Sequence, residues 1–127
     1  MSEASTEGVV VTVEPRYHAE RSSPLERYWF FTYTVTITNS GEYSVQLVSR
    51  HWIITNATGH VEHVRGPGVV GETPVLQPGQ SFTYTSACPL PTSLGSMEGT
   101  YEMEREDGRR FDVAIAPFTL VDPSELN

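Results

Sequence analysis

The segment Tyr28-Trp29-Phe30-Phe31-Thr32-Tyr33-Thr34-Val35-Thr36-Ile37-Thr38 decides the fold, because apolar and polar side chains alternate along nearly all of it. Successive side chains of a β-strand point to opposite faces, so one face of this strand is apolar and the other is polar. The apolar face carries Trp29, Phe31, Tyr33, Val35 and Ile37, and the polar face carries Thr32, Thr34, Thr36 and Thr38. The pattern predicts a strand that packs on a core with one face and meets water with the other.

Six further segments have the composition of strands, and turn residues separate them. They are residues 9–13, a strand that Pro15 is expected to terminate, and residues 44–55, 60–64, 80–86, 97–105 and 111–115. Alternation is less regular in residues 44–55, which predicts a bulge or burial on both faces. Residues 88–95 contain two prolines and are predicted to be a loop. About seven strands without an amphipathic helix predict an all-β fold, a sandwich of two antiparallel sheets.

The length of 127 residues fits a single domain with one core. We expect residues 8–121 to form this domain, with a disordered lead-in at residues 1–7 and a tail at residues 122–127. Cys88 is the only cysteine, which excludes an internal disulfide, and no apolar run approaches the roughly 20 residues that span a bilayer. A reducing, cytoplasmic location is the simplest interpretation.

The charge of the chain excludes several classes of function. Sixteen acidic residues against eight arginines leave a net charge of −8, which repels nucleic acid and anionic membrane surfaces. The chain has no lysine, so Schiff-base chemistry and a phosphate-binding loop of the Gly-Lys-Ser/Thr type are excluded. A site for an anion must therefore use Arg, His, hydroxyl groups or backbone N–H groups.

The segment Gly66-Pro67-Gly68-Val69-Val70-Gly71 matches the G-x-G-x-x-G pattern of dinucleotide-binding proteins. That pattern requires a helix after its last glycine, and Pro74 and Pro78 oppose a helix after Gly71. A dinucleotide site is therefore not expected, and two interpretations stay open. The glycines permit unusual backbone angles in a tight connection, or successive N–H groups of the loop form a small anion-binding nest that Arg65 assists.

Arg50 and His51 lie in the middle of a predicted strand, which is an unusual place for charge unless it is exposed or paired. A guanidinium can form two hydrogen bonds with a phosphate or a carboxylate. Arg50 therefore either pairs with one of the glutamates of the chain or contacts a ligand or partner. The candidate anion-binding or partner-binding set comprises Arg50, His51, Arg65, Gly66, Gly68 and Gly71.

The spacing of the metal-ligating and nucleophilic residues does not indicate a metal site or a catalytic site. His60 and His63 are three residues apart, which places them on opposite faces of a strand. Cys88 is expected to be a small buried hydrophobe rather than a nucleophile that acts with His51. The glutamates of residues 97–105 are expected on an exposed face. We predict no catalytic residues, no bound metal, no cofactor and no enzyme activity.

Several longer segments, taken in order, are similar to one known family over nearly the full length of the chain. They are Val45-Gln46-Leu47, Ser49-Arg50-His51-Trp52-Ile53-Ile54-Thr55, Val64-Arg65-Gly66, Gly68-Val69-Val70-Gly71-Glu72, Pro74-Val75-Leu76, Pro78-Gly79, Tyr84-Thr85-Ser86, Cys88-Pro89-Leu90 and Phe111-Asp112-Val113. The chain resembles the ApaG family, small bacterial proteins whose domain also occurs in some eukaryotic F-box and polymerase-interacting proteins. The resemblance implies a fibronectin type III or immunoglobulin-like β-sandwich, in agreement with the strand pattern.

The resemblance also implies a function, since ApaG proteins are associated with cobalt resistance and magnesium efflux, and it brings no catalytic set. Our first hypothesis is a non-enzymatic binding module in divalent-cation homeostasis that acts through a protein partner. The alternative is binding of phosphate, pyrophosphate or a nucleotide at the glycine loop, which the resemblance places at Gly66, Gly68 and Gly71. We expect neither nucleic acid nor a membrane span among the partners.

Overall fold

The computed structural model describes residues 1–126, which form strands joined by turns and three short 3-10 helices. The strands are β1 (Ser2–Thr6), β2 (Val9–Tyr17), β3 (Trp29–Asn39), β4 (Val45–Asn56), β5 (Val61–Pro67), β6 (Val75–Leu76), β7 (Ser81–Leu90), β8 (Leu94–Arg105) and β9 (Arg110–Val121). The 3-10 helices are η1 (Ala19–Arg21), η2 (Pro24–Glu26) and η3 (Pro123–Leu126).

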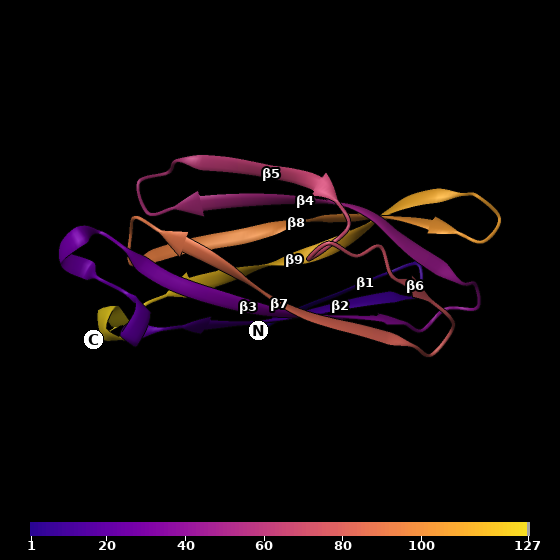
Figure 1. Cartoon of the computed structure of the whole chain (residues 1–127), viewed down its shortest axis with the longest axis horizontal. Coiled ribbons are helices and arrows are strands. Elements are labelled where there is room, and N and C mark those ends of the chain that lie inside the picture. Colours follow the sequence, from indigo (N-terminus) through magenta and orange to yellow (C-terminus); the bar gives the residue numbers. More distant parts are fainter. Residues whose placement is uncertain (127) are drawn as a thin grey trace.

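Two antiparallel sheets pack face to face as a sandwich (Figure 1). The first sheet has the strand order β1-β2-β3-β7, and the second has the order β5-β4-β8-β9, with β6 paired to the start of β4. The seven longer strands correspond to the seven predicted segments, and β1 and β6 are additional. The predicted all-β, two-sheet antiparallel sandwich is confirmed.

The alternation predicted for β3 is present in the structure. Phe31, Tyr33, Val35 and Ile37 are buried between the sheets, whereas Trp29 is only half-buried at the start of the strand. The threonines of the other face are hydroxyl partners of β7, in the pairs Thr34–Thr85, Thr36–Thr83 and Thr38–Ser81. Cross-strand pairs of this kind stabilise two neighbouring strands in one register.

The centre of the core is aromatic and joins the two sheets. Trp52 of β4 is 2% exposed and meets the rings of Tyr33, Tyr101 and Phe118 nearly edge to face, with centroids 5.1 to 6.2 Å apart. The hydroxyls of Tyr84 in β7 and Tyr101 in β8 form a buried hydrogen bond from one sheet to the other. Aromatic packing therefore fixes the face of β4 that looks inward.

The irregularity predicted for β4 is a β-bulge. The register between β4 and β8 shifts between Leu47 and Ser49, so Val48 has no partner of its own in β8. Leu47 and Trp52 both face the core although they are five residues apart, which strict alternation would forbid. The bulge thus turns the second half of β4 so that Arg50, opposite the buried Tyr101, has its side chain on the inner face with Trp52, while His51 lies on the outer face.

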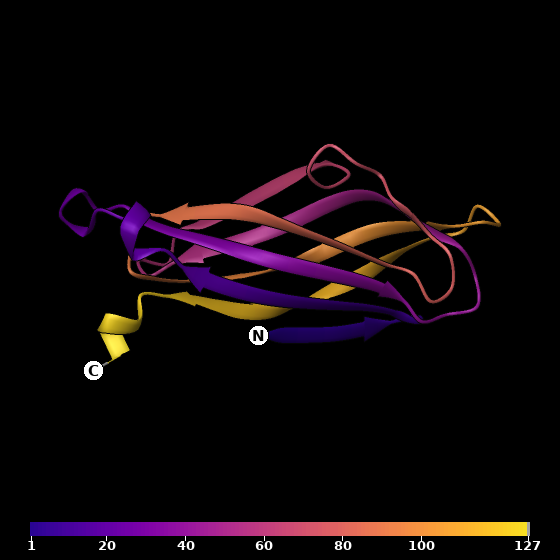
Figure 2. The ribbon, with the colours of Figure 1, turned by 60° about the horizontal axis from the view of Figure 1, so that its bottom comes forward.

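The expected disordered lead-in at residues 1–7 is wrong, because Ser2–Thr6 form β1 and pair in register with Val9–Val13 of β2. The Thr6 hydroxyl also accepts a hydrogen bond from the Ala114 N–H of the second sheet, at 3.2 Å. A short polar sequence can form a strand when a neighbour offers free backbone groups, since the hydrogen bonds do not depend on the side chains. Figure 2 shows β1 along the lower side of the molecule, near β9.

The expected tail at residues 122–127 is in part a continuation of the domain. Asp122 is 7% exposed, and its N–H donates to the Ser93 carbonyl at 2.9 Å. Its carboxylate accepts hydrogen bonds from the N–H and hydroxyl of Ser124 at the start of η3. Asn127 lies outside the described residues.

Two predictions based on proline are also wrong. The first strand continues through Pro15 to Tyr17, because β1 ends opposite Val13 and β2 is paired only with β3 from there on. Residues 88–90 belong to β7 rather than to a loop, and Pro89 lies in a strand that pairs within its sheet only with β3. Proline is tolerated at both places because an edge strand does not need an N–H donor on its free side.

Candidate functional site

Arg50 holds the glycine loop rather than a carboxylate. It lies opposite Gly66 in the β4–β5 pair, and its Nη1 donates to the carbonyls of Pro67 at 2.9 Å and Gly68 at 3.0 Å. A Cβ at position 66 would lie 3.0 Å from both terminal guanidinium nitrogens, so a glycine there leaves the space that the guanidinium uses. Of the two open interpretations of Arg50, neither the glutamate pair nor a free ligand contact describes this arrangement.

The loop after β5 is closed by a tight turn from Val69 to Glu72, whose N–H and carbonyl groups bond each other at 2.8 Å in both directions. Val70 and Gly71 at the centre of the turn have φ of +43° and +80°, the backbone of a type I′ turn. Gly68 has φ +58°, and a Cβ there would lie 2.2 Å from the Glu72 carbonyl oxygen. The interpretation of the glycines as conformational requirements is therefore supported at positions 68 and 71.

An anion-binding nest at this loop has few backbone donors left. The Gly68 N–H donates to the Val48 carbonyl at 2.9 Å, and the Val69 N–H donates to Glu72 within the turn. Within residues 1–126, no backbone hydrogen bond is made by the N–H groups of Val70 and Gly71. A phosphate at the loop would thus meet these two turn amides, at the exposed tip that Figure 2 shows protruding from the second sheet.

Four of the six candidate residues line one groove on the outer face of the second sheet, with a volume of about 590 Å³. One side of the groove carries His51 and Arg65, and the other side carries the carboxylates of Glu102 and Asp112. Arg50 also lines the groove, but its guanidinium lies toward the inner face, on the carbonyls of Pro67 and Gly68. Gly66 also lines the groove, whereas Gly68 is buried beside it and Gly71 lies at the tip of the turn. The structure thus brings Arg50, His51, Arg65 and Gly66 together and leaves Gly68 and Gly71 as framework.

The acidic side of the groove is held by its own contacts. Glu102 accepts a hydrogen bond from the Ser49 hydroxyl at 3.1 Å and lies 3.5 Å from the Arg110 guanidinium. Arg65, across the groove, is exposed, and no ion pair within residues 1–126 involves it. The groove therefore offers separate charges of both signs to another molecule.

Sequence reasoning missed a histidine pair at the rim of this groove. His51 of β4 and His63 of β5 lie on the same face, with Nε2 of the first 2.9 Å from Nδ1 of the second and the rings stacked at 5.2 Å between centroids. Partial desolvation, then the charges of Arg65 and His63, lower the pKa of His51. The spacing of His60 and His63 in the sequence does not indicate this contact. The hairpin register does, because it places His51 opposite Arg65, and His63, two residues before Arg65, therefore lies diagonally across from His51 on the same face.

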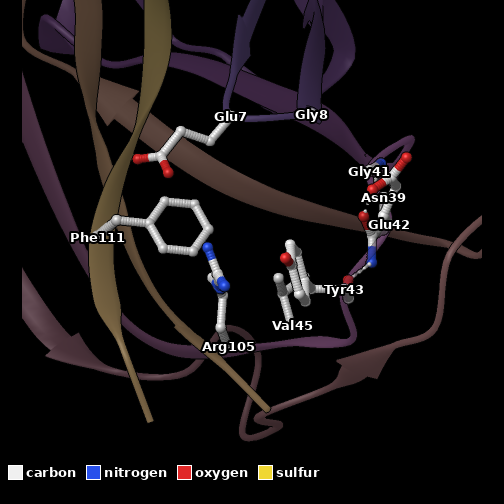
Figure 3. A pocket seen from close by; sticks show the side chains of 9 residues that line it. All are labelled: Glu7, Gly8, Asn39, Gly41, Glu42, Tyr43, Val45, Arg105 and Phe111. Atoms are coloured by element: carbon white, nitrogen blue, oxygen red, sulfur yellow. Dashed lines mark hydrogen bonds between the residues drawn. The ribbon is translucent and has the colours of Figure 1, made fainter. Parts of the chain in front are cut away.

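A second hollow of about 380 Å³ lies near the β1–β2 turn and between the sheets. Figure 3 shows the Arg105 guanidinium between the rings of Phe111 and Tyr43, below the carboxylate of Glu7. Arg105 lies 3.8 Å from the Tyr43 ring centroid and pairs with Asp107 at 2.7 Å. Because a paired side chain of the protein occupies its centre, this hollow is a weaker candidate for a binding site than the groove.

Cys88 lies in the core, as expected for a small buried hydrophobe. Burial raises the pKa of its thiol to about 11, so the thiol form predominates at neutral pH. Within residues 1–126, no group of three or more His, Cys, Asp and Glu side chains is arranged to hold a metal ion. No helix in this part of the chain has the length and apolar composition needed to cross a membrane.

The fold and the groove together define a class of protein, a two-sheet β-sandwich of the fibronectin type III kind with a groove of mixed charge on its outer surface. Residues 19–105 match the model of the ApaG domain family. The chain is 54% identical over 123 residues to the protein ApaG of Rhodopseudomonas palustris, which covers 97% of this chain and 95% of that protein. It is 57% identical over 120 residues to the protein ApaG of a Methylobacterium species, and the match covers 94% of this chain and 92% of that protein. The chain belongs to the ApaG family.

Solved structures agree with the fold. The crystal structure of the putative ApaA protein of Bordetella pertussis superposes with a TM-score of 0.89 at 51% sequence identity, covering 91% of this chain and 94% of that one. The C-terminal domain of wzt matches with a TM-score of 0.54 at 10% sequence identity, covering 94% of this chain and 76% of that one. This match shows likeness of fold alone. The fold predicted from the strand pattern and from the family resemblance is thus confirmed.

Proposed function

We propose that this chain is a non-enzymatic binding module that acts in divalent-cation homeostasis, in cobalt resistance and magnesium efflux, through a protein partner. Membership of the ApaG family supports the link to cations. The groove that Arg50, His51 and Arg65 line together with Glu102 and Asp112 is the contact surface of this proposal.

The mixed charge of the groove is the observation that carries the proposal. A phosphate that approaches Arg65 also approaches two carboxylates, which repel it, whereas a protein surface can present a carboxylate to Arg65 and a cation to Asp112. Complementary charges at the rim of an interface mainly raise the rate of association and the specificity. A protein partner with paired charges therefore fits this groove better than a polyanion does.

The test is a pull-down with the full chain from an extract of the source cell, quantified by mass spectrometry. Arg65→Glu and Asp112→Lys are expected to deplete the specific partners at least fivefold, because each replaces an attraction by a repulsion. Arg16→Glu, an exposed site on β2 of the other sheet, is the matched control and is expected to retain them. Retention of every specific partner by both groove variants contradicts this contact surface.

The link to cations has its own test, growth on cobalt of a host that lacks its ApaG protein. Expression of this chain is expected to restore growth, and expression of Arg65→Glu is expected to fail to do so at an equal protein level. If Arg65→Glu restores growth fully, the groove is not needed for the cation phenotype.

The alternative, binding of phosphate, pyrophosphate or a nucleotide at the loop, has one favourable observation. The turn amides of Val70 and Gly71 and the exposed Arg65 guanidinium remain as donors. Titration of the ¹⁵N-labelled chain with millimolar pyrophosphate and ATP, with and without Mg²⁺, is expected to shift these amides if the alternative holds. Amides that stay unshifted from Gly66 to Gly71 contradict it.

A further inference from the structure

The paired histidines at the rim of the groove present two metal-ligating nitrogens at close range. His51 Nε2 and His63 Nδ1 are 2.9 Å apart on neighbouring strands. At that distance one ring nitrogen donates a hydrogen bond to the other, so one carries a proton and the other a lone pair. His63 is exposed and His51 is half-exposed, so an ion can reach both rings from solvent.

The separation matches that of two neighbouring ligands on one metal ion. Metal–imidazole bonds are about 2.0–2.1 Å long, so two nitrogens at right angles around the ion lie about 2.9 Å apart, and two at the tetrahedral angle about 3.4 Å. The first value equals the distance between His51 and His63. Adjacent positions of a square-planar or octahedral ion therefore require only a rotation of the rings, not a movement of the strands.

The charges around the two imidazoles bear on the binding of a cation. A metal ion binds the neutral form of imidazole through a ring nitrogen that carries a lone pair. The charge of Arg65 opposes a cation locally, whereas the net charge of −8 attracts cations to the molecule at long range. The pairing of β4 with both β5 and β8 fixes the position of His51.

We propose that His51 and His63 form a two-histidine site for a divalent transition-metal ion of borderline softness, Cu²⁺, Ni²⁺ or Zn²⁺, on the outer face of the β4–β5 hairpin. Imidazole prefers these ions, and Cu²⁺ binds most tightly in the usual order, whereas Mg²⁺ prefers oxygen ligands. On binding, the ring that carries the shared proton changes tautomer, so that this proton passes through water to its other ring nitrogen and both facing nitrogens present a lone pair. Water or a group of another molecule takes the remaining positions. The site stands on the histidine geometry and does not rest on the proposed partner.

The experiment is calorimetric titration of the full, untagged chain with Cu²⁺ in a non-coordinating buffer, together with electron paramagnetic resonance of the bound ion. One equivalent is expected to bind with two imidazole nitrogens in its spectrum. His63→Ala and His51→Ala are each expected to weaken binding at least tenfold, because a single imidazole loses the second bond. Zn²⁺ is expected to shift the ring signals of both histidines in NMR spectra.

His60→Ala is the matched control, since it removes a histidine from the same hairpin and is expected to change the affinity less than twofold. Affinities for His51→Ala and His63→Ala within twofold of the unmodified chain overturn the site, as does a loss with His60→Ala equal to theirs. Circular dichroism checks that each variant keeps the fold. His63→Ala leaves Arg65 and Asp112 in place, so a failure of this site and a failure of the proposed partner surface are distinguishable.

Discussion

At the scale of single residues, glycine gives the loop and the groove their shape. Gly66 leaves space for the Arg50 guanidinium, and Gly68 has both a left-handed backbone and a carbonyl oxygen where its Cβ would be. Gly71 shares the left-handed backbone but has no atom within 4 Å of that position. The two left-handed glycines therefore differ in how much a side chain costs.

Gly68→Ala is expected to destabilise the fold more than Gly71→Ala does. An alanine in the left-handed region costs about 1–2 kcal/mol, which is the expected loss for Gly71→Ala. Gly68→Ala adds the clash with the Glu72 carbonyl, so its loss is expected to be at least twice as large. Urea denaturation measures both, and equal losses would contradict the crowding at position 68.

Arg50 and Arg65 are neighbours in the groove, but we expect different effects on stability. Arg50→Ala removes two charge-assisted hydrogen bonds to loop carbonyls and is expected to cost about 1.5–3 kcal/mol. Arg65→Ala, at an exposed site, is expected to stay within about 0.5 kcal/mol. Urea denaturation of both variants checks this, and a stability loss for Arg65→Ala as large as that for Arg50→Ala would refute the distinction.

At the scale of elements, the predictions that failed concern strands at the edges of the sheets. The alternation of β3 predicts a strand because its two faces meet different surroundings. Residues 1–7, by contrast, carry no apolar pattern, and Ser2–Thr6 form a strand because β2 offers a free row of backbone groups. Such pairing lies in the backbone, so composition does not reveal it.

Deletion of residues 2–6 is expected to lower the free energy of unfolding by at least about 2 kcal/mol, because several backbone hydrogen bonds worth about 0.5–1.5 kcal/mol each are lost. Hydrogen exchange at β2 is expected to accelerate, since its edge is then open to water. Glu3→Ala keeps the backbone pairing at an exposed site and is the control. Unchanged stability and exchange in the deletion variant would show that β1 contributes nothing.

At the scale of the whole molecule, the two sheets are joined by the aromatic core and by one buried hydroxyl pair. Tyr84 belongs to the first sheet and Tyr101 to the second, and their hydroxyls bond each other away from water. Desolvation is the main cause that raises the pKa of both phenols above the ordinary value. The pair is therefore neutral over the whole physiological range.

A double-mutant cycle tests the coupling between the sheets. Tyr84→Phe and Tyr101→Phe each leave one buried hydroxyl without its partner, and each is expected to cost about 1–3 kcal/mol. The double variant removes both hydroxyls and is expected to lose less than the sum. Additive losses in thermal or urea denaturation would mean that the two hydroxyls are not coupled.

The raised pKa of these phenols also predicts how stability depends on alkaline pH. In the unfolded chain tyrosine ionises near pH 10, a pH at which the folded pair is still neutral. The unfolded state then holds fewer protons than the folded state, so stability is complete below pH 10 and falls as the pH rises above it. Denaturation midpoints between pH 8 and 11 are expected to fall less for the double phenylalanine variant than for the unmodified chain.

Much of the fold and part of the site were predictable, and particular residues show the limit. The apolar face of β3 and the bulge expected in residues 44–55 follow from local alternation, which is set within a few residues. Pro15 and Pro89 were misplaced because their tolerance depends on which neighbour a strand lacks. The partners of Arg50 were missed because they are main-chain carbonyls of another strand and its loop, which no pattern of side chains in the sequence predicts.

The sequence by itself determined the class of fold and the family, because alternation, turn residues and the order of the motifs are local properties of the chain. Only the tertiary structure decided that Arg50 serves the loop, that Arg65 faces two carboxylates across a groove, and that His51 meets His63. The physical reason is register. Side chains far apart in the chain become neighbours only when backbone pairing sets which residues of β4, β5 and β8 lie opposite each other.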